Sequence, residues 1–213
     1  MVEYLRLWSA VHDAALQRPT PGAVDVFIWK WSSDGAFSSR SAYGMLFQGT
    51  TGLAAAPLIW DSFAPLKHRF HAWLALRRRC WTADRRIRRG LPSHVLCPLC
   101  GLTPETLDHL SLHCPYAQEI WTSLVARIGL LTVVPALNSG INDWWLLAAA
   151  RVPRTQRKQL NSLVMLALRA LWLERNDRVF QGKSLQASAT LSKILDEWGS
   201  WVACRGGASG DID

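Results

Sequence analysis

Apolar residues recur every three or four positions along most of this chain, a spacing typical of helices that bury one face. Prolines and glycines end several of these stretches, as Pro19, Pro65 and Gly90 do. The helices expected from the pattern cover residues 1–17, 42–47, 58–63, 66–74, 83–89, 115–128, 143–150, 154–180 and 185–201. The chain is therefore predicted to be mostly helical, and the last two helices are expected to pair as a hairpin.

One stretch near the N-terminus has a different period. Aromatic residues at 27, 29 and 31 alternate with the residues at 26, 28 and 30, and Ser-Ser-Asp-Gly at 32–35 supplies a turn. Residues 36–38 then return in the opposite direction. This pattern predicts an N-terminal β-hairpin.

The expected helix 66–74 shows which side we predict to be buried. Its apolar stripe has the spacing i, i+4, i+7, i+8 and consists of Leu66, Phe70, Trp73 and Leu74. The polar residues that lie off this stripe are His68, Arg69 and His71. The chain contains twelve tryptophans, and we interpret the tryptophan-rich stripes as core rather than as platforms for nucleic-acid bases.

Composition narrows the class of protein. With 213 residues, 49% hydrophobic and 19% charged, the chain is expected to fold around a sizeable core. Neither a signal peptide nor an apolar run long enough to cross a membrane is apparent, so we expect a protein that is not secreted and has no membrane partner. The five cysteines are then expected to be metal ligands or reduced thiols rather than disulfides.

The most specific motif is the stretch CPLCGLTPETLDHLSLHC at residues 97–114. Cys97, Cys100, His109 and Cys114 have the spacing C-x2-C-x8-H-x4-C, and soft ligands at such spacing suit one tetrahedral Zn2+ ion. Gly101 permits the positive φ that turns backbone N–H groups toward the thiolates. His113 is an alternative fourth ligand, although we prefer Cys114 because thiolate binds zinc strongly. One structural zinc ion is therefore predicted.

The positive charge is concentrated just before this motif. Residues 67–89 hold nine basic side chains and one acid, which gives a net charge of +8, equal to the formal charge of the whole chain. The basic residues are Lys67, Arg69, Arg77, Arg78, Arg79, Arg85, Arg86, Arg88 and Arg89. Such a block beside a metal knuckle indicates a phosphate-backbone partner, RNA or DNA, bound without sequence preference. A solvated basic face that only offsets the charge of a zinc-thiolate site is the alternative.

Three blocks in this order resemble a known family. They are similar to the zinc-binding domain of reverse transcriptases from plant LINE-type (non-LTR) retrotransposons. The blocks are DGAFSSRSAY, then IWDSFAPLKHRFHAWLALRRRCWTADRRIRRG, then CPLC…ETLDHLSLHCPYAQEIW. The resemblance covers residues 25–127, places the four ligand positions on the cysteines and histidine named above, and extends weakly into LWLERNDRVF at 171–180. The family usually has an asparagine-arginine pair where this chain has Arg78 and Arg79. The resemblance, together with the basic cluster, implies nuclear residence, and the cytoplasm is the alternative.

The sequence does not indicate an enzyme. The polymerase, endonuclease and ribonuclease H domains of such polyproteins need clustered carboxylates, and this chain has no Asp-Asp pair. Its adjacent acids Asp196 and Glu197 lie in a helical pattern. Cys80 and Cys204 lack a histidine and acid arrangement that would make either a nucleophile.

These observations predict an α+β protein, mostly α, in which an N-terminal β-hairpin and helices surround a Cys3His zinc knuckle and a helical tail follows. The expected parts are a helical lead-in at 1–22, the zinc-binding domain at 25–127, a connector at 128–153, a helical tail at 154–204 and a disordered end at 205–213. The expected function is a non-catalytic, nucleic-acid-binding zinc module derived from a retrotransposon. The alternatives are a structural or protein-interaction module that docks a partner through its tail helices, and an inert retroelement remnant.

Overall fold

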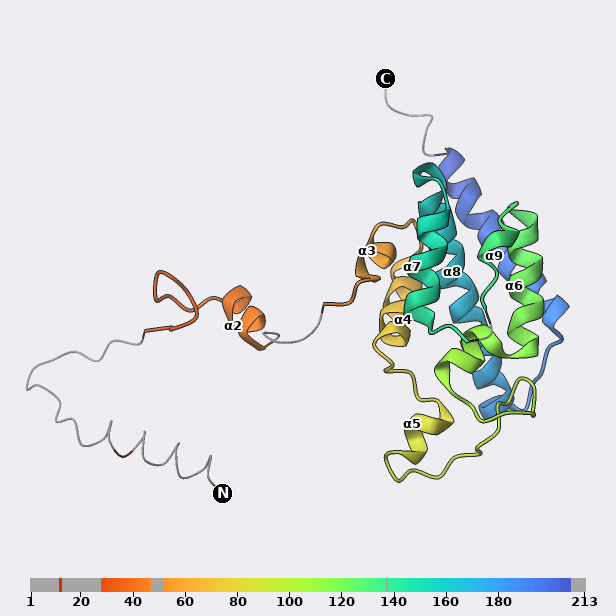
Figure 1. The fold of residues 1–213 in the computed structure, drawn as a ribbon, viewed down its shortest axis with the longest axis horizontal. Coiled ribbons are helices and arrows are strands. Elements are labelled where there is room, and N and C mark those ends of the chain that lie inside the picture. The colour runs from red at the N-terminus through yellow and green to blue at the C-terminus, as the bar shows by residue number, and fades with distance from the viewer. Residues whose placement is uncertain (1–11, 13–27, 47–51, 137, 208–213) are drawn as a thin grey trace, which may run out of the picture. The chain divides into compact units, whose positions relative to one another are not determined.

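The computed structural model describes residues 12, 28–46, 52–136 and 138–207. The chain divides into two compact units, residues 1–51 and residues 52–213 (Figure 1). The predicted lead-in helix lies outside the described residues except for His12, as do residues 208–213 of the predicted disordered end. The predicted boundaries at residues 127 and 153 stay predictions.

The predicted β-hairpin is wrong for the residues that can be checked. Residues 28–38 form a loop in which the Trp29 N–H donates to the Gly35 carbonyl over 2.8 Å, and helix α2 (Ser39–Leu46) follows. Residues 25–27 of the predicted first arm lie outside the described residues. Within the loop, the Trp29 ring packs on Trp31 and Phe37 with centroid distances of 4.8 and 5.0 Å.

Local side-chain bonds explain why this loop is not a β-ladder. The Ala36 N–H donates to the Asp34 carboxylate over 3.0 Å, and the Ser32 hydroxyl donates to the Ala36 carbonyl over 2.8 Å. Such bonds compete with cross-strand pairing, and a two-stranded hairpin alone is only marginally stable. The described residues contain no β-strand, only the isolated bridge between Leu96 and Pro104, so this part of the chain is all-α rather than α+β.

The second unit is a bundle of helices. Its elements are α3 (Ala56–Trp60), α4 (Leu66–Leu76), α5 (Ala83–Ile87), the π-turn η1 (His109–His113), α6 (Pro115–Arg127), the 3-10 turn η2 (Leu131–Val133), α7 (Ile141–Arg151), α8 (Arg154–Asn176), the π-turn η3 (Asp177–Gln181) and α9 (Ala187–Gly207). No helix among the described residues is long and apolar enough to cross a membrane.

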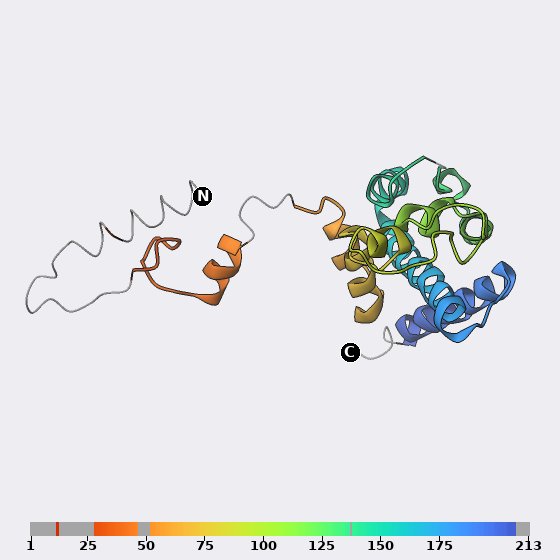
Figure 2. The same ribbon diagram turned by 90° about the horizontal axis from the view of Figure 1, so that it is seen from below.

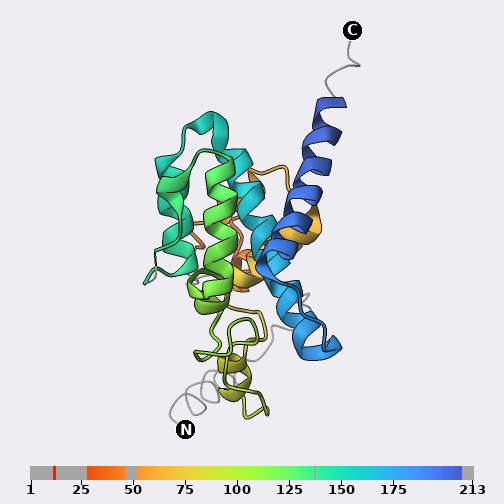
Figure 3. The same cartoon turned by 90° about the vertical axis from the view of Figure 1, so that its right-hand side faces the viewer.

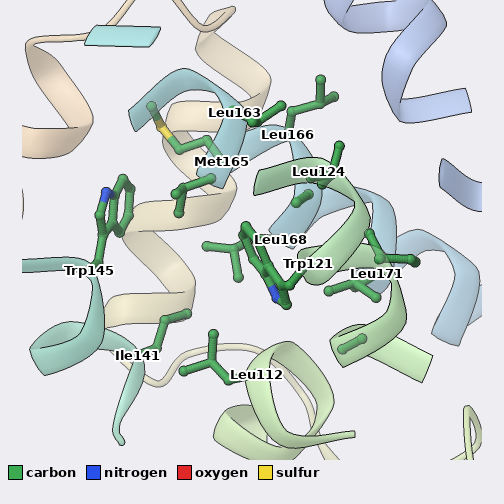
Figure 4. Close-up of a cluster of buried hydrophobic side chains, with 14 of the residues drawn as sticks. Leu112, Trp121, Leu124, Ile141, Trp145, Leu163, Met165, Leu166, Leu168 and Leu171 are labelled. Atoms are coloured by element: carbon green, nitrogen blue, oxygen red, sulfur yellow. The ribbon is translucent and has the colours of Figure 1, made fainter. Parts of the chain in front are cut away.

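Helix α8 forms the centre of this bundle. It packs against α3, α4, η1, α7 and α9, and Figure 2 shows it running between the other helices. Every residue from Leu160 to Leu168 is buried, because helices cover α8 on several sides. The pairing of α8 with α9 confirms the expected helical hairpin. Figure 4 shows side chains of α6, α7 and α8, including Trp121, Trp145 and Leu168, meeting in one core.

Helix α4 buries a different face from the predicted one along its first half. Leu66 and Phe70 are 71% and 54% exposed, whereas the buried residues are His68, His71, Ala72, Ala75 and Leu76. Small alanines allow α4 to approach α8 closely, and the His68 Nε2 lies 3.3 Å from the Glu197 carboxylate of α9. The predicted stripe was therefore wrong for Leu66 and Phe70, whereas Trp73 and Leu74 are half-buried and pack against core residues.

The segment between α5 and η1 lies at one end of the bundle, and the C-terminal end of α9 lies at the other (Figure 3). This segment carries the Cys-His motif, and the arginines of α5 precede it directly. The bundle thus presents the candidate metal ligands and most of the basic segment at the same end.

Candidate functional site

Cys97 and Cys100, the first two cysteines of the Cys-His motif, lie in a tight turn between two antiparallel chain segments. The Cys97 N–H donates to the Thr103 carbonyl and the Glu105 N–H donates to the Val95 carbonyl, both over 2.8 Å. The Gly101 N–H closes the turn on the Cys97 carbonyl over 2.8 Å, with a φ of 68° at Gly101. The predicted left-handed glycine is therefore confirmed, and this turn is referred to below as the knuckle, residues 95–105.

The π-turn η1 brings the other two candidate ligands together. His109 and Cys114 are five residues apart, and in an α-helix such residues point about 140° apart around the axis. The Cys114 N–H instead donates to the His109 carbonyl over 2.7 Å, the i to i−5 bond of a π-turn, which brings them nearer to one side. Cys114 also caps α6, which begins at Pro115 as predicted.

The four side chains fit one tetrahedral zinc ion. The ligand atoms of Cys97, Cys100, His109 and Cys114 all lie within 4.8 Å of one another. The Cys97 and Cys114 sulfur atoms are 4.0 Å apart, and the Cys100 sulfur lies 3.4 Å from the His109 Nε2. Tetrahedral Zn–S and Zn–N bonds would place such pairs about 3.8 and about 3.5 Å apart.

The alternative ligand His113 lies outside this cluster. Its Nε2 donates to the Ser139 carbonyl over 2.9 Å, so the ring contacts the segment before α7. Among the residues that the structure describes, one group of three or more His, Cys, Asp or Glu side chains is arranged to hold a metal ion, and it is this Cys3His cluster.

The electrostatics of the cluster favour a thiolate at Cys97. The bond with Cys114 and the backbone N–H groups of Cys100 and Leu99 lower the pKa of Cys97 to about 5, although burial opposes the shift. The same bond with Cys97, burial and the charge on Cys97 raise the pKa of Cys114. A cation between the two sulfurs would remove this repulsion, and N–H groups at the start of α6 already point at Cys114.

Residues outside the Cys-His motif hold the knuckle in place, and the spacing of the motif does not indicate them. Arg178 donates to the carbonyls of Pro98 and Leu99 over 3.1 and 2.9 Å, and its Nε pairs with the Glu174 carboxylate over 2.8 Å. Both side chains lie in the LWLERNDRVF segment, so the weak resemblance there was a usable signal. Nearer the cluster, the Thr103 hydroxyl lies 3.0 Å from the His109 Nε2.

A buried ion pair joins helix α8 to Glu105 at the end of the knuckle. The Arg175 guanidinium bonds both oxygens of Glu105 over 2.6 and 3.0 Å, and these side chains are 4% and 1% exposed. The Glu105 carboxylate also accepts the Ala83 N–H over 2.9 Å. This network connects α5, the knuckle and α8 across 70 residues of sequence.

The comparison with known proteins agrees with this geometry. Residues 37–121, which include all four clustered side chains, match the family model described as zinc-binding in reverse transcriptase. This stretch is a retrotransposon-type reverse-transcriptase zinc-binding domain. The zinc-binding domain therefore includes α2 to α5, the knuckle, η1 and the first half of α6.

A relative from Arabidopsis thaliana supports the same family. This protein, whose name marks it as a candidate ribonuclease H protein, is 32% identical over 113 residues. The alignment covers 50% of this chain and 18% of the relative, so the similarity concerns a small part of that protein. No solved structure matches this chain significantly.

Two of the nine predicted nucleic-acid-binding residues, Lys67 and Arg69, lie apart from the others on α4 and contact other parts of the bundle. The Lys67 Nζ lies 3.5 Å from the Glu197 carboxylate. Arg69 donates to the carbonyls of Ala64 and Ser62 over 2.7 and 2.6 Å. These two side chains lie on α4 and do not line the cavity that most of the other seven basic residues share.

Six arginines surround a cavity of about 290 Å3 after the end of α4. They are Arg77, Arg78, Arg79, Arg85, Arg88 and Arg89. Asp84 also lines the cavity and pairs with Arg88, so these seven side chains carry a formal charge of +5. The remaining arginine, Arg86, donates to the Pro92 carbonyl over 2.8 Å. We refer to this cavity as the arginine pocket.

The backbone at Arg78, one of the residues that line this pocket, is strained. The N–H groups of Arg78 and Arg79 close the end of α4 on the carbonyls of Ala75 and Leu74 over 2.8 and 2.7 Å, the two bonds of a Schellman motif. Arg78 occupies the position usually held by glycine, with a φ of 52°. Its guanidinium pairs with Asp108 over 2.8 Å, next to the candidate ligand His109.

The remaining cysteines do not have the environment of a nucleophile. Cys80 is buried, and burial raises its pKa to about 11 even though the His71 Nε2 lies 4.0 Å from its sulfur. Burial likewise lowers the pKa of His71 to about 4, so neither group is charged at neutral pH. Cys204 is exposed on α9.

Proposed function

We propose that the zinc-binding domain holds one structural Zn2+ ion through Cys97, Cys100, His109 and Cys114, and that it presents the arginine pocket to nucleic acid. A site with four protein ligands and no open position is typical of structural zinc rather than catalytic zinc. The ion would contribute folding free energy by joining the knuckle to η1 and α6. The single observation that carries this part is the convergence of four ligand atoms within 4.8 Å.

The non-catalytic part of the proposal follows from how the acidic side chains are used. Glu105, Glu174, Asp84 and Asp108 each pair with an arginine. Polymerase and ribonuclease H chemistry needs carboxylates that converge on divalent metal ions. These four acids are used in ion pairs, and among the described residues the group of His, Cys, Asp and Glu that could hold a metal is the Cys3His cluster, which supports a binding role.

The nucleic-acid part rests on the arginine pocket. Guanidinium groups bind phosphate oxygens in a bidentate way and remain charged at all relevant pH values. Six of them around one cavity, with a single acid, form a site for the backbone of RNA or DNA without sequence preference. For the same reason we propose that the chain acts in the nucleus, where its nucleic-acid partner would be found.

Zinc is tested first, by native mass spectrometry of protein purified without added metal. We expect one zinc ion per chain, lost in Cys97→Ser and Cys114→Ser. His113→Ala is the matched control and should keep the ion, because His113 bonds Ser139 instead. A folded wild-type protein without zinc, or loss of zinc in His113→Ala alone, would refute the ligand assignment.

Nucleic-acid binding is tested by fluorescence anisotropy between 50 and 200 mM salt with the zinc-loaded chain. In the variant Arg77→Gln/Arg79→Gln/Arg89→Gln the slope of log affinity against log salt should be smaller in magnitude by about 3. The reason is that binding releases about one counterion fewer for each phosphate contact that is lost. The control Arg127→Gln/Arg151→Gln/Arg154→Gln removes the same charge from exposed positions elsewhere. Equal effects of the two variants, or no binding at 50 mM salt, would favour a structural or protein-interaction module.

A further inference from the structure

Trp81 lies beside the arginine pocket with its indole facing solvent. Its side chain is 46% exposed, although the neighbouring residues Cys80 and Thr82 are buried at 7% and 2%. The Thr82 N–H donates to the Cys80 carbonyl over 3.0 Å, which fixes the backbone on both sides of the tryptophan. The indole is therefore held outward by an ordered backbone that is anchored in the core.

Two arginines of the pocket contact this ring. The guanidinium carbon of Arg85 lies 4.9 Å from the Trp81 centroid, and that of Arg89 lies 6.0 Å from it. Cys80 and Thr82 also line the arginine pocket, so the indole stands at its edge. An aromatic face and a group of phosphate-binding cations thus occur within one short stretch of chain.

This pair of features suits one class of nucleic acid. In a duplex the bases stack on one another and their faces are covered, whereas an unpaired base can stack on an aromatic side chain while arginines bind its backbone. The pocket of about 290 Å3 has the volume of roughly ten water molecules, so a phosphodiester group fits with part of its hydration.

We propose that Trp81 is a stacking platform that makes the zinc-binding domain prefer single-stranded RNA or DNA, with a base on the indole and the adjacent phosphate in the arginine pocket. This inference rests on the proposed nucleic-acid function and adds the class of nucleic acid. It also assigns Trp81 a role in binding, whereas the sequence pattern favoured tryptophans as core. The buried Trp121, Trp144 and Trp145 fit that expectation, and Trp81 does not.

The test is anisotropy titration of the zinc-loaded full chain with a 12-nucleotide oligothymidine, a 12-nucleotide oligouridine and a 12-base-pair duplex. Stacking on an aromatic ring is worth about 5- to 150-fold in affinity per base, so Trp81→Ala should weaken single-strand binding about tenfold or more. Duplex binding should change less than twofold, and Trp81→Phe should retain most of the single-strand affinity.

Two further variants separate stacking from bulk and from stability. Trp81→Leu keeps an apolar side chain without an aromatic face and should lose single-strand affinity as Trp81→Ala does. Trp60→Ala is the matched control, because Trp60 is 50% exposed and lies on α3, outside the basic segment. Its affinity should equal that of the wild type, and zinc content checks that each variant is folded.

The outcomes distinguish the two proposals. If the wild type binds neither single strands nor duplex at 50 mM salt, the proposed nucleic-acid function fails. If the wild type binds both and Trp81→Ala and Trp81→Leu bind single strands as it does, nucleic-acid binding stands and the role of Trp81 is refuted. Equal loss in Trp60→Ala and Trp81→Ala would also refute it.

Discussion

Replacing Arg175 by methionine should be among the most destabilising substitutions in this protein. The substitution leaves the Glu105 carboxylate 1% exposed, with the Ala83 N–H as its remaining bond of those described above. Removing one partner of a buried ion pair costs about 3–5 kcal/mol, a large part of the 5–15 kcal/mol that stabilises a typical domain. The free energy of unfolding should fall by that amount.

Urea denaturation with saturating zinc, followed by far-UV circular dichroism, measures this loss. The midpoint of Arg175→Met should lie at least about 1 M below that of the wild type, given a urea dependence of about 1–3 kcal/mol per molar. Arg154→Met is the matched control, because Arg154 is an exposed residue in the first turn of the same helix, and its effect should stay within about 0.5 kcal/mol.

A double variant that also neutralises Glu105 shows whether the unpaired buried charge causes the loss of stability. In the double variant Arg175→Met/Glu105→Gln the neutral amide can still accept the Ala83 N–H, so about 2 kcal/mol should return. A loss below about 1 kcal/mol in Arg175→Met, or no recovery in the double variant, would refute the reasoning. The first result would mean that the carboxylate is solvated in solution.

Three further predictions concern single positions. Arg78→Gly should raise the free energy of unfolding by about 0.5–1 kcal/mol, because glycine adopts the observed φ of 52° without strain and the ion pair lost with the exposed Arg78 is weak; a lower urea midpoint would contradict this. Arg178→Ala should weaken zinc binding about tenfold in competition with a chelator, because it frees the knuckle carbonyls of Pro98 and Leu99, and an unchanged affinity would show that Arg178 does not position the site. The pKa of His71 is lowered to about 4 by burial, and then by Arg169, so protons favour the unfolded chain below its ordinary pKa of about 6.5. Lowering the pH from 7.5 to 5.5 with saturating zinc should therefore cost the wild type about 1.3 kcal/mol more than His71→Gln, and equal losses in urea denaturation would exclude this role.

The strain at Arg78 also gives a physical reason for a sequence difference. The family that this chain resembles usually has asparagine followed by arginine here, and asparagine tolerates the left-handed conformation better than arginine does. In this chain the Schellman bonds that end α4 come from the backbone and not from the Arg78 side chain. The additional guanidinium lines the arginine pocket, so the substitution exchanges local backbone stability for positive charge.

Local patterns in the sequence were sufficient for much of this protein. The 3.6-residue period identified α4, α6, α8 and α9, and Pro115 marked the start of α6, because helix formation depends on side chains within a few positions. The spacing of Cys97, Cys100, His109 and Cys114 identified the cluster in the same way, since a knuckle is a short-range structure. The hairpin prediction failed at residues 28–38 because alternation alone cannot supply a third strand to pair with.

Only the tertiary structure decided which faces are buried and which distant residues support the site. Helix α4 buries its histidines and alanines because the neighbouring α8 and α9 select the face that packs closely, and no pattern within α4 contains that information. The Arg178 contacts with the knuckle and the Glu105–Arg175 pair likewise join segments far apart in the sequence. The sequence by itself determined which residues can bind zinc and phosphate, and packing determined how they are held and exposed.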